Sequence, residues 1–194
     1  MLAGVAAQRA LELRLSARHE AALRARGAVE HGRRHFPLLV ALHALWPLAL
    51  ALEVARGGAR PGAGWPLWLL PLTAAECLRI AAMRALGERW TVRVWVLPGA
   101  PPLGRGPYRW LRHPNYVAVA LELIAIPMLF GAWRTALAAT LANALALALR
   151  IPVEERALRE AVRGEVVSAP PPPRGAGADR PPPEPARAPG SRGA

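Results

Sequence analysis

Residues 114–149 read PNYVAVALELIAIPMLFGAWRTALAATLANALALAL, and this apolar stretch decides the fold. As one helix rising about 1.5 Å per residue it would exceed about 50 Å, whereas the hydrocarbon core of a bilayer is about 30 Å thick. The stretch is broken by Gly-Ala-Trp-Arg at residues 131–134. We therefore expect two membrane spans, about residues 114–133 and 135–149, folded back as a helical hairpin. The residues on either side of the hairpin then emerge at the same membrane face.

Two more apolar stretches precede the hairpin, at about residues 36–55 and 65–83. Each has about the 20 residues that a transmembrane helix needs. The sequence therefore predicts an all-α integral membrane protein with four transmembrane helices and a C-terminal helical hairpin. The apolar part of the amino-terminal segment is short, which leaves open a fifth span.

The chain divides into three predicted regions. Residues 1–35 mix leucines with arginines and predict an amphipathic helix at the membrane interface. Residues 36–167 form the membrane domain. Residues 168–194 are mostly Pro, Gly, Ala and Arg, with almost nothing apolar to bury, and predict a disordered tail.

The net charge of +12 comes from arginines, since the chain has no lysine. Such a charge is typical of nucleic-acid binding. Here the arginines lie between apolar runs, which favours membrane lipid and excludes nucleic acid as the partner. The single cysteine, Cys77, excludes a disulfide framework, and we predict no metal site.

The arginines also predict the orientation in the membrane. Three follow the first span or lie in the hairpin turn: Arg56, Arg60 and Arg134. Nine lie at the other face: Arg89, Arg93, Arg105, Arg109, Arg112, Arg150, Arg156, Arg159 and Arg163. By the positive-inside rule the richer face is cytoplasmic, with both chain termini inside. A composition rich in Ala, Arg, Gly and Pro is typical of a GC-rich bacterial genome, and we therefore expect the bacterial inner membrane.

Residues 88–112 are not membrane-like and predict a structured cytoplasmic loop. Residues 91–96 alternate as a short strand would, and prolines and glycines at 98–102 favour turns. The loop leads into Arg112 and His113 at the start of the third span, where Pro114 suits a first helical turn. Cations and free backbone donors at a helix start hold anions.

After the hairpin, Glu154 and Glu155 return to the layer of Arg112 and His113. Arginines, a histidine, paired carboxylates and nearby aromatic rings could hold a zwitterionic cofactor such as S-adenosylmethionine. The alternative is that the basic residues are interfacial anchors and the glutamates begin a solvated helix. Spacing alone leaves both interpretations open.

Arg-His-Pro-Asn-Tyr at 112–116, followed after a membrane hairpin by Glu154 and Glu155, resembles the isoprenylcysteine carboxyl methyltransferase family over about residues 86–158. The resemblance implies S-adenosylmethionine as cofactor, a cofactor-binding loop region and a methyltransferase domain at 36–167. The cofactor-binding residues that it implies are Tyr108, His113, Pro114, Tyr116, Arg150, Glu154 and Glu155. Where many relatives have glycine two residues after the tyrosine, this chain has Ala118.

The function that follows is O-methylation of a lipid-tailed acceptor, with Arg112, His113 and Glu122 as the catalytic candidates. Residues 30–37 and 89–94 resemble a bacterial branch associated with type III polyketide synthases. The acceptor is then an isoprenylcysteine carboxylate or an alkylated phenol or pyrone, the latter supplied by a neighbouring polyketide synthase. Since related His-Pro-x-Tyr sequences occur in sterol-reductase-like enzymes, an NADPH-dependent reductase is one alternative. A non-catalytic membrane scaffold is another.

Polar residues within the spans have structural alternatives. Glu122 stands alone in the third span, where a carboxylate is costly unless paired, so it is either functional or bonded to Asn143 or an arginine. Glu76 and Arg79 are spaced to pair on one helix face, with substrate contact as the alternative. His43 is expected to form an interhelical hydrogen bond.

Overall fold

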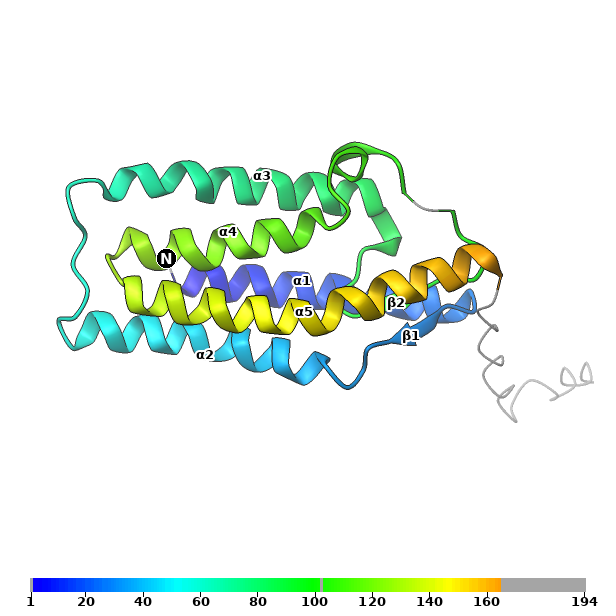
Figure 1. Cartoon of the computed structure of the whole chain (residues 1–194), viewed down its shortest axis with the longest axis horizontal. Helices are drawn as coiled ribbons and strands as arrows, with labels where there is room; N and C mark the ends of the chain where they lie inside the picture. The colour runs from blue at the N-terminus through cyan, green and yellow to red at the C-terminus, as the bar shows by residue number, and fades with distance from the viewer. Residues whose placement is uncertain (1, 102, 165–194) are drawn as a thin grey trace, which may run out of the picture.

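The computed structural model describes residues 2–101 and 103–164. The predicted tail at 168–194 lies outside these residues. Five long helices run lengthwise along one bundle (Figure 1). They are α1 (Leu2–Ala25), α2 (Phe36–Ala55), α3 (Leu69–Leu86), α4 (Pro114–Leu129) and α5 (Trp133–Arg163). Three short 3-10 helices connect them: η1 (Trp65–Trp68), η2 (Gly87–Arg89) and η3 (Gly106–Arg109).

The helices α4 and α5 form the predicted hairpin, joined by a tight turn at Gly131. This glycine has a φ of +72°, which favours glycine. A Cβ atom built on it would lie 2.0 Å from the carbonyl oxygen of Arg60. The turn therefore needs glycine both for its backbone conformation and for close contact with the α2–η1 connection.

The shortest of the five long helices, α4, is the central one. Its 16 residues span about 24 Å at 1.5 Å per residue. Residues along its whole length are buried, from Pro114 and Ala118 to Ile126 and Leu129. Its first turn is therefore held firmly against α3 and α5.

Three helical segments are long and apolar enough to cross a bilayer: Phe36–Ala55, Trp65–Arg89 and Trp133–Arg163. The fourth expected span corresponds to α4, which falls below that length. Many large apolar side chains point outward from the segments that qualify, among them Leu45, Leu48, Leu67, Leu70, Leu141 and Leu145. A surface of this kind is suited to lipid rather than water.

Helix α1 runs along the bundle, which differs from the interfacial placement that its composition suggests (Figure 1). In Figure 1 the amino end of α1 lies at the end of the bundle away from the carboxyl end of α5, whereas the arginine distribution predicts both chain termini on one side of the membrane. The physical reason is a set of polar contacts inside the bundle. Gln8 donates a hydrogen bond to Glu76 of α3 at 3.0 Å, and Arg9 pairs with Glu122 of α4.

A two-stranded antiparallel sheet lies beside the last part of α5. It joins β1 (Val29–His31) to β2 (Val94–Val96), with Val29 opposite Val96. The predicted strand at 91–96 is thus shorter than expected, and β1 was not expected. Val94 and Val96 form a buried cluster with Ala157 and Ala161 of α5. This packing fixes the loop before η3 against the helix that carries Glu154 and Glu155.

Candidate functional site

The hairpin brings His113 to the two glutamates of α5. Nδ1 of the imidazole lies 3.6 Å from Oε1 of Glu154, and Nε2 lies 3.4 Å from Oε1 of Glu155. Both ring nitrogens thus face carboxylates, an arrangement that suits the doubly protonated ring, since it has two donors. The predicted convergence of the residues before α4 with those after the membrane part of α5 is therefore present.

Tyr116 extends this cluster along the first turn of α4. Its phenol donates a hydrogen bond to Oε2 of Glu154 and accepts one from Nε of Arg150 at 2.6 Å. Its ring stacks on that of His113, with centroids 5.3 Å apart and an interplanar angle of 16°. Nη2 of the same arginine donates to the carbonyl oxygen of Val92 at 2.6 Å. Arg150 therefore joins the site to the loop that precedes β2.

The environment of His113 favours the imidazolium. The polar contact with Glu154 is the main cause that raises the pKa of His113, and the contact with Glu155 and the charges of both glutamates act in the same direction, while burial opposes them. The cluster therefore holds a cation between two carboxylates at the membrane-facing end of the loop.

The remaining predicted residues border the cluster. Arg112 is 86% exposed and lies 3.6 Å from Glu155, so it can reach an incoming anion. Tyr108 lies on η3, and its partial burial, followed by the charge of Glu154, raises its pKa, so the phenol stays neutral. Pro114 is buried and begins α4, as the sequence predicts. Arg105, one of the arginines of this face, donates to the carbonyl oxygen of Ala85 at 2.9 Å.

Asn115 is a further candidate that the sequence analysis did not single out. Its Oδ1 atom is buried, and among the described residues it has no hydrogen-bond partner. A buried acceptor without a partner is costly, and five other buried side-chain atoms of the described residues are in the same state, so what distinguishes Asn115 is its position beside Pro114 and Tyr116. In the sequence, the sign of this candidate was its place between Pro114 and Tyr116 in Arg-His-Pro-Asn-Tyr at 112–116.

Glu122 belongs to a different cluster. It lies six residues beyond Tyr116, about 9 Å along the helix axis, and its Oε1 accepts a hydrogen bond from Nε of Arg79 at 2.9 Å. The arginine alternative is thus the contact that forms, whereas Oδ1 of Asn143 has no partner in the described chain. Glu122 is not among the groups that surround His113.

Two other polar residues of the spans, Glu76 and His43, also have partners. The expected pair of Glu76 and Arg79 is present at 3.9 Å. His43 contacts the carbonyl oxygen of Leu39 at 2.9 Å, four residues back in its own helix, in place of the expected interhelical bond. Both are structural contacts within one helix.

Comparison with known proteins finds sequence similarity over the region that carries these residues. The sequence profile of the isoprenylcysteine carboxyl methyltransferase (ICMT) family matches residues 68–160, a range that contains the whole cluster. The chain is 33% identical over 160 residues to the uncharacterized protein YpbQ of Bacillus subtilis (strain 168), covering 82% of this chain and 95% of the relative. It is 32% identical over 155 residues to an uncharacterized protein of Haemophilus influenzae, covering 79% and 90%. No solved structure gives a significant match.

Proposed function

Because this chain belongs to the isoprenylcysteine carboxyl methyltransferase family, we propose that it is an S-adenosylmethionine-dependent O-methyltransferase of lipid-tailed acceptors. The protein is an integral membrane protein with helices long and apolar enough to span. The observation that carries the proposal is the meeting of His113, Tyr116 and Glu154 at one end of the α4–α5 hairpin. A site at that level can take a soluble cofactor from water and an acceptor from the bilayer.

The groups around this cluster fit the polar parts of S-adenosylmethionine. Its carboxylate suits the exposed guanidinium of Arg112. Its ammonium and ribose hydroxyls suit Glu155 and Oδ1 of Asn115, which has no hydrogen-bond partner within the described part of the chain. Its adenine suits the ring of Tyr108. When bound, the cofactor supplies an electrophilic methyl group.

The protein's own part in such a reaction is to align the acceptor oxygen and exclude water. An isoprenylcysteine carboxylate arrives ionised and needs only to be positioned. A phenol or hydroxypyrone must lose its proton. The raised pKa of His113 favours the protonated ring, so this imidazole accepts the proton of the phenol only after it has lost its own.

We also propose that this end of the bundle faces the cytoplasm. The loops and helix ends around the cluster carry Arg105, Arg109 and Arg112, with Arg156 and Arg159 on α5. The opposite end has only Arg56, Arg60 and Arg134 among the described residues. This asymmetry supports a cytoplasmic site by the positive-inside rule.

The proposal is tested by transfer of labelled methyl groups from S-adenosylmethionine in membranes that contain the protein. A farnesylated cysteine derivative is one acceptor, and an alkylresorcinol or alkylpyrone is the other. We expect transfer to one of the two and its loss in Glu154→Gln. Glu160→Gln, on the same helix, is the matched control and should keep activity.

Two results would reject the methyltransferase. Oxidation of NADPH without methyl transfer would identify a reductase. No saturable binding of S-adenosylmethionine by calorimetry, with the protein folded, would identify a scaffold. Transfer to the phenolic acceptor would also support a polyketide synthase as the supplier of substrate.

A further inference from the structure

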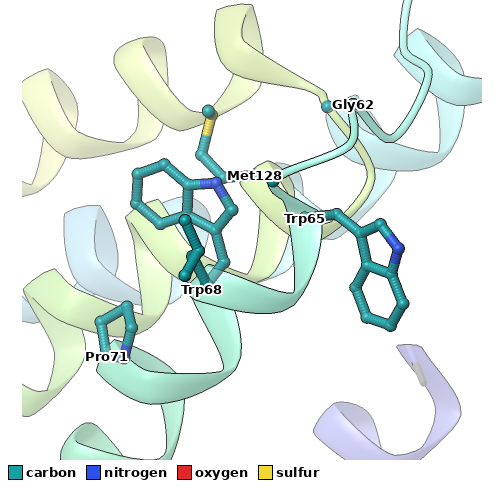
Figure 2. Close-up of a pocket in the computed structure, with 8 residues that line it drawn as sticks. Gly62, Trp65, Trp68, Pro71 and Met128 are labelled. Carbon is teal, nitrogen blue, oxygen red and sulfur yellow. The ribbon is translucent and has the colours of Figure 1, made fainter.

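An apolar cavity of about 420 Å³ lies at the end of the bundle opposite the His113 cluster. It is formed by the segment before α3 together with the α4–α5 turn, and its lining includes Trp65, Leu67, Trp68, Pro71, Met128 and Gly131. Figure 2 shows the indole of Trp68 beside Met128, whereas the indole of Trp65 points to the other side. Its volume is within the range of ligand pockets, about 300–1,000 Å³.

The lining of this cavity suits a hydrocarbon chain. None of its lining residues carries a charge. Leu67 is 77% exposed and Trp65 is 44% exposed, so the mouth of the cavity opens toward the surroundings of the helices. In a membrane protein these surroundings are acyl chains, and indoles at helix ends lie at the level of the lipid head groups.

The rim of the cavity is basic. The backbone of Arg60 lies against Gly131, which lines the cavity, and Arg134 follows three residues later. Arg56, Arg60 and Arg134 all have exposed side chains. The acidic residue of this end, Glu53, accepts hydrogen bonds from Thr135 through the backbone N at 2.8 Å and through Oγ1 at 2.6 Å, and one from the backbone N of Arg134 at 3.4 Å. Its charge also acts on that of Arg134, so it offsets one of the three guanidinium groups.

Three guanidinium groups and one carboxylate give this rim a net positive charge. A cation-rich rim beside an uncharged, indole-lined cavity matches a molecule with an anionic head group and a hydrocarbon chain. We propose that this cavity binds an anionic phospholipid, with an acyl chain against Trp68 and Met128 and the phosphodiester at Arg60 and Arg134. This site is separate from the proposed methyltransferase site and independent of which leaflet it occupies.

The test uses the full-length protein in non-ionic detergent and tryptophan fluorescence. Bromine on an acyl chain quenches an indole that it touches. Phosphatidylglycerol with brominated chains should therefore quench at lower concentration than phosphatidylcholine with the same chains. The variant Trp68→Phe should lose the part of the signal that is selective for phosphatidylglycerol.

Arginine variants keep the reporter and remove the charge. Arg60→Gln and Arg134→Gln should each weaken the apparent affinity for phosphatidylglycerol about fivefold, and the double variant more, with phosphatidylcholine unaffected. Arg18→Gln, an exposed arginine of α1, is the matched control and should change neither. Equal quenching by both lipids in the unmodified protein, or selectivity that survives in the double variant, overturns the proposal.

Discussion

The phenol of Tyr116 donates a hydrogen bond to the carboxylate of Glu154, although the two residues are 38 positions apart. The contact joins the two helices of the α4–α5 hairpin. Tyr116 lies in the first turn of α4, and Glu154 lies on α5 after the apolar stretch that ends at residue 149. It forms because the hairpin places both at the same end. The local hydrogen-bond network of the proposed cofactor site therefore depends on a tertiary fold.

Tyr116→Phe should weaken S-adenosylmethionine binding about tenfold. The change removes a hydrogen bond to a charged group, worth about 1.5 kcal/mol, and leaves Glu154 free to turn away. Calorimetry on the detergent-solubilised protein measures the affinity, and thermal unfolding checks that the variant is folded. A folded variant with unchanged affinity would contradict the assigned role.

His113 should make stability depend on pH. A raised pKa means that its ion pairs with Glu154 and Glu155 are fully present below the ordinary value of 6.5 and are lost as pH rises through the folded-state value. The difference in melting temperature between the protein and His113→Gln should therefore be largest near about pH 6 and shrink toward about pH 9. Thermal scans across that range measure it, and a constant difference would argue against the ion pairs.

The buried ionic cluster should hold α1 in place. Arg79 has a 2% exposed side chain and pairs with Glu122 and Glu12, while Arg9 is 24% exposed. Removing one member of a buried ion pair costs about 3–5 kcal/mol. Arg79→Met should therefore destabilise more than Arg9→Met, and both more than Arg14→Met, whose side chain is exposed.

Thermal unfolding gives this order, and limited proteolysis reports the release of α1. Arg9→Met should speed cleavage within α1, because it removes the contact between that helix and α4. Equal stability of Arg9→Met and Arg14→Met would show that the Arg9 contacts contribute nothing.

Gly131→Ala should destabilise the hairpin turn. Its φ of +72° disfavours other residues, and the new methyl group would meet the carbonyl oxygen of Arg60. Gly57→Ala separates the two effects, because Gly57 has a φ of +70° but no atom within 4 Å of an added Cβ. We expect a loss of about 1 kcal/mol for Gly57→Ala and a clearly larger one for Gly131→Ala. Equal melting temperatures for the two variants would contradict the close contact.

The hairpin and the convergence of His113 with Glu154 could be predicted because they follow from lengths. An apolar run too long for one span must fold back, and the Gly131 break shows where. Both ends of the run then meet at one face. The hairpin can therefore be predicted without knowledge of how its side chains pack.

Other features depend on contacts that no local pattern encodes. The strand β1 has three residues, too few for a periodic signal, and forms because β2 lies beside it. The polarity of α1 indicates an interfacial helix, but its charges are satisfied by Arg79 and Glu122, far along the chain. Asn115 and the carbonyl of Val92 matter through their surroundings, which only the folded chain defines.

The shortness of α4 has a consequence for the depth at which His113 lies. At about 24 Å, α4 is shorter than a hydrocarbon core of about 30 Å and packs between the longer helices α3 and α5. A helix of that length cannot reach both surfaces of the core, so with the Gly131 turn near one surface the first turn of α4 lies within the opposite leaflet. A lipid then presents its polar end to His113 with its chain still immersed, at little cost in desolvation.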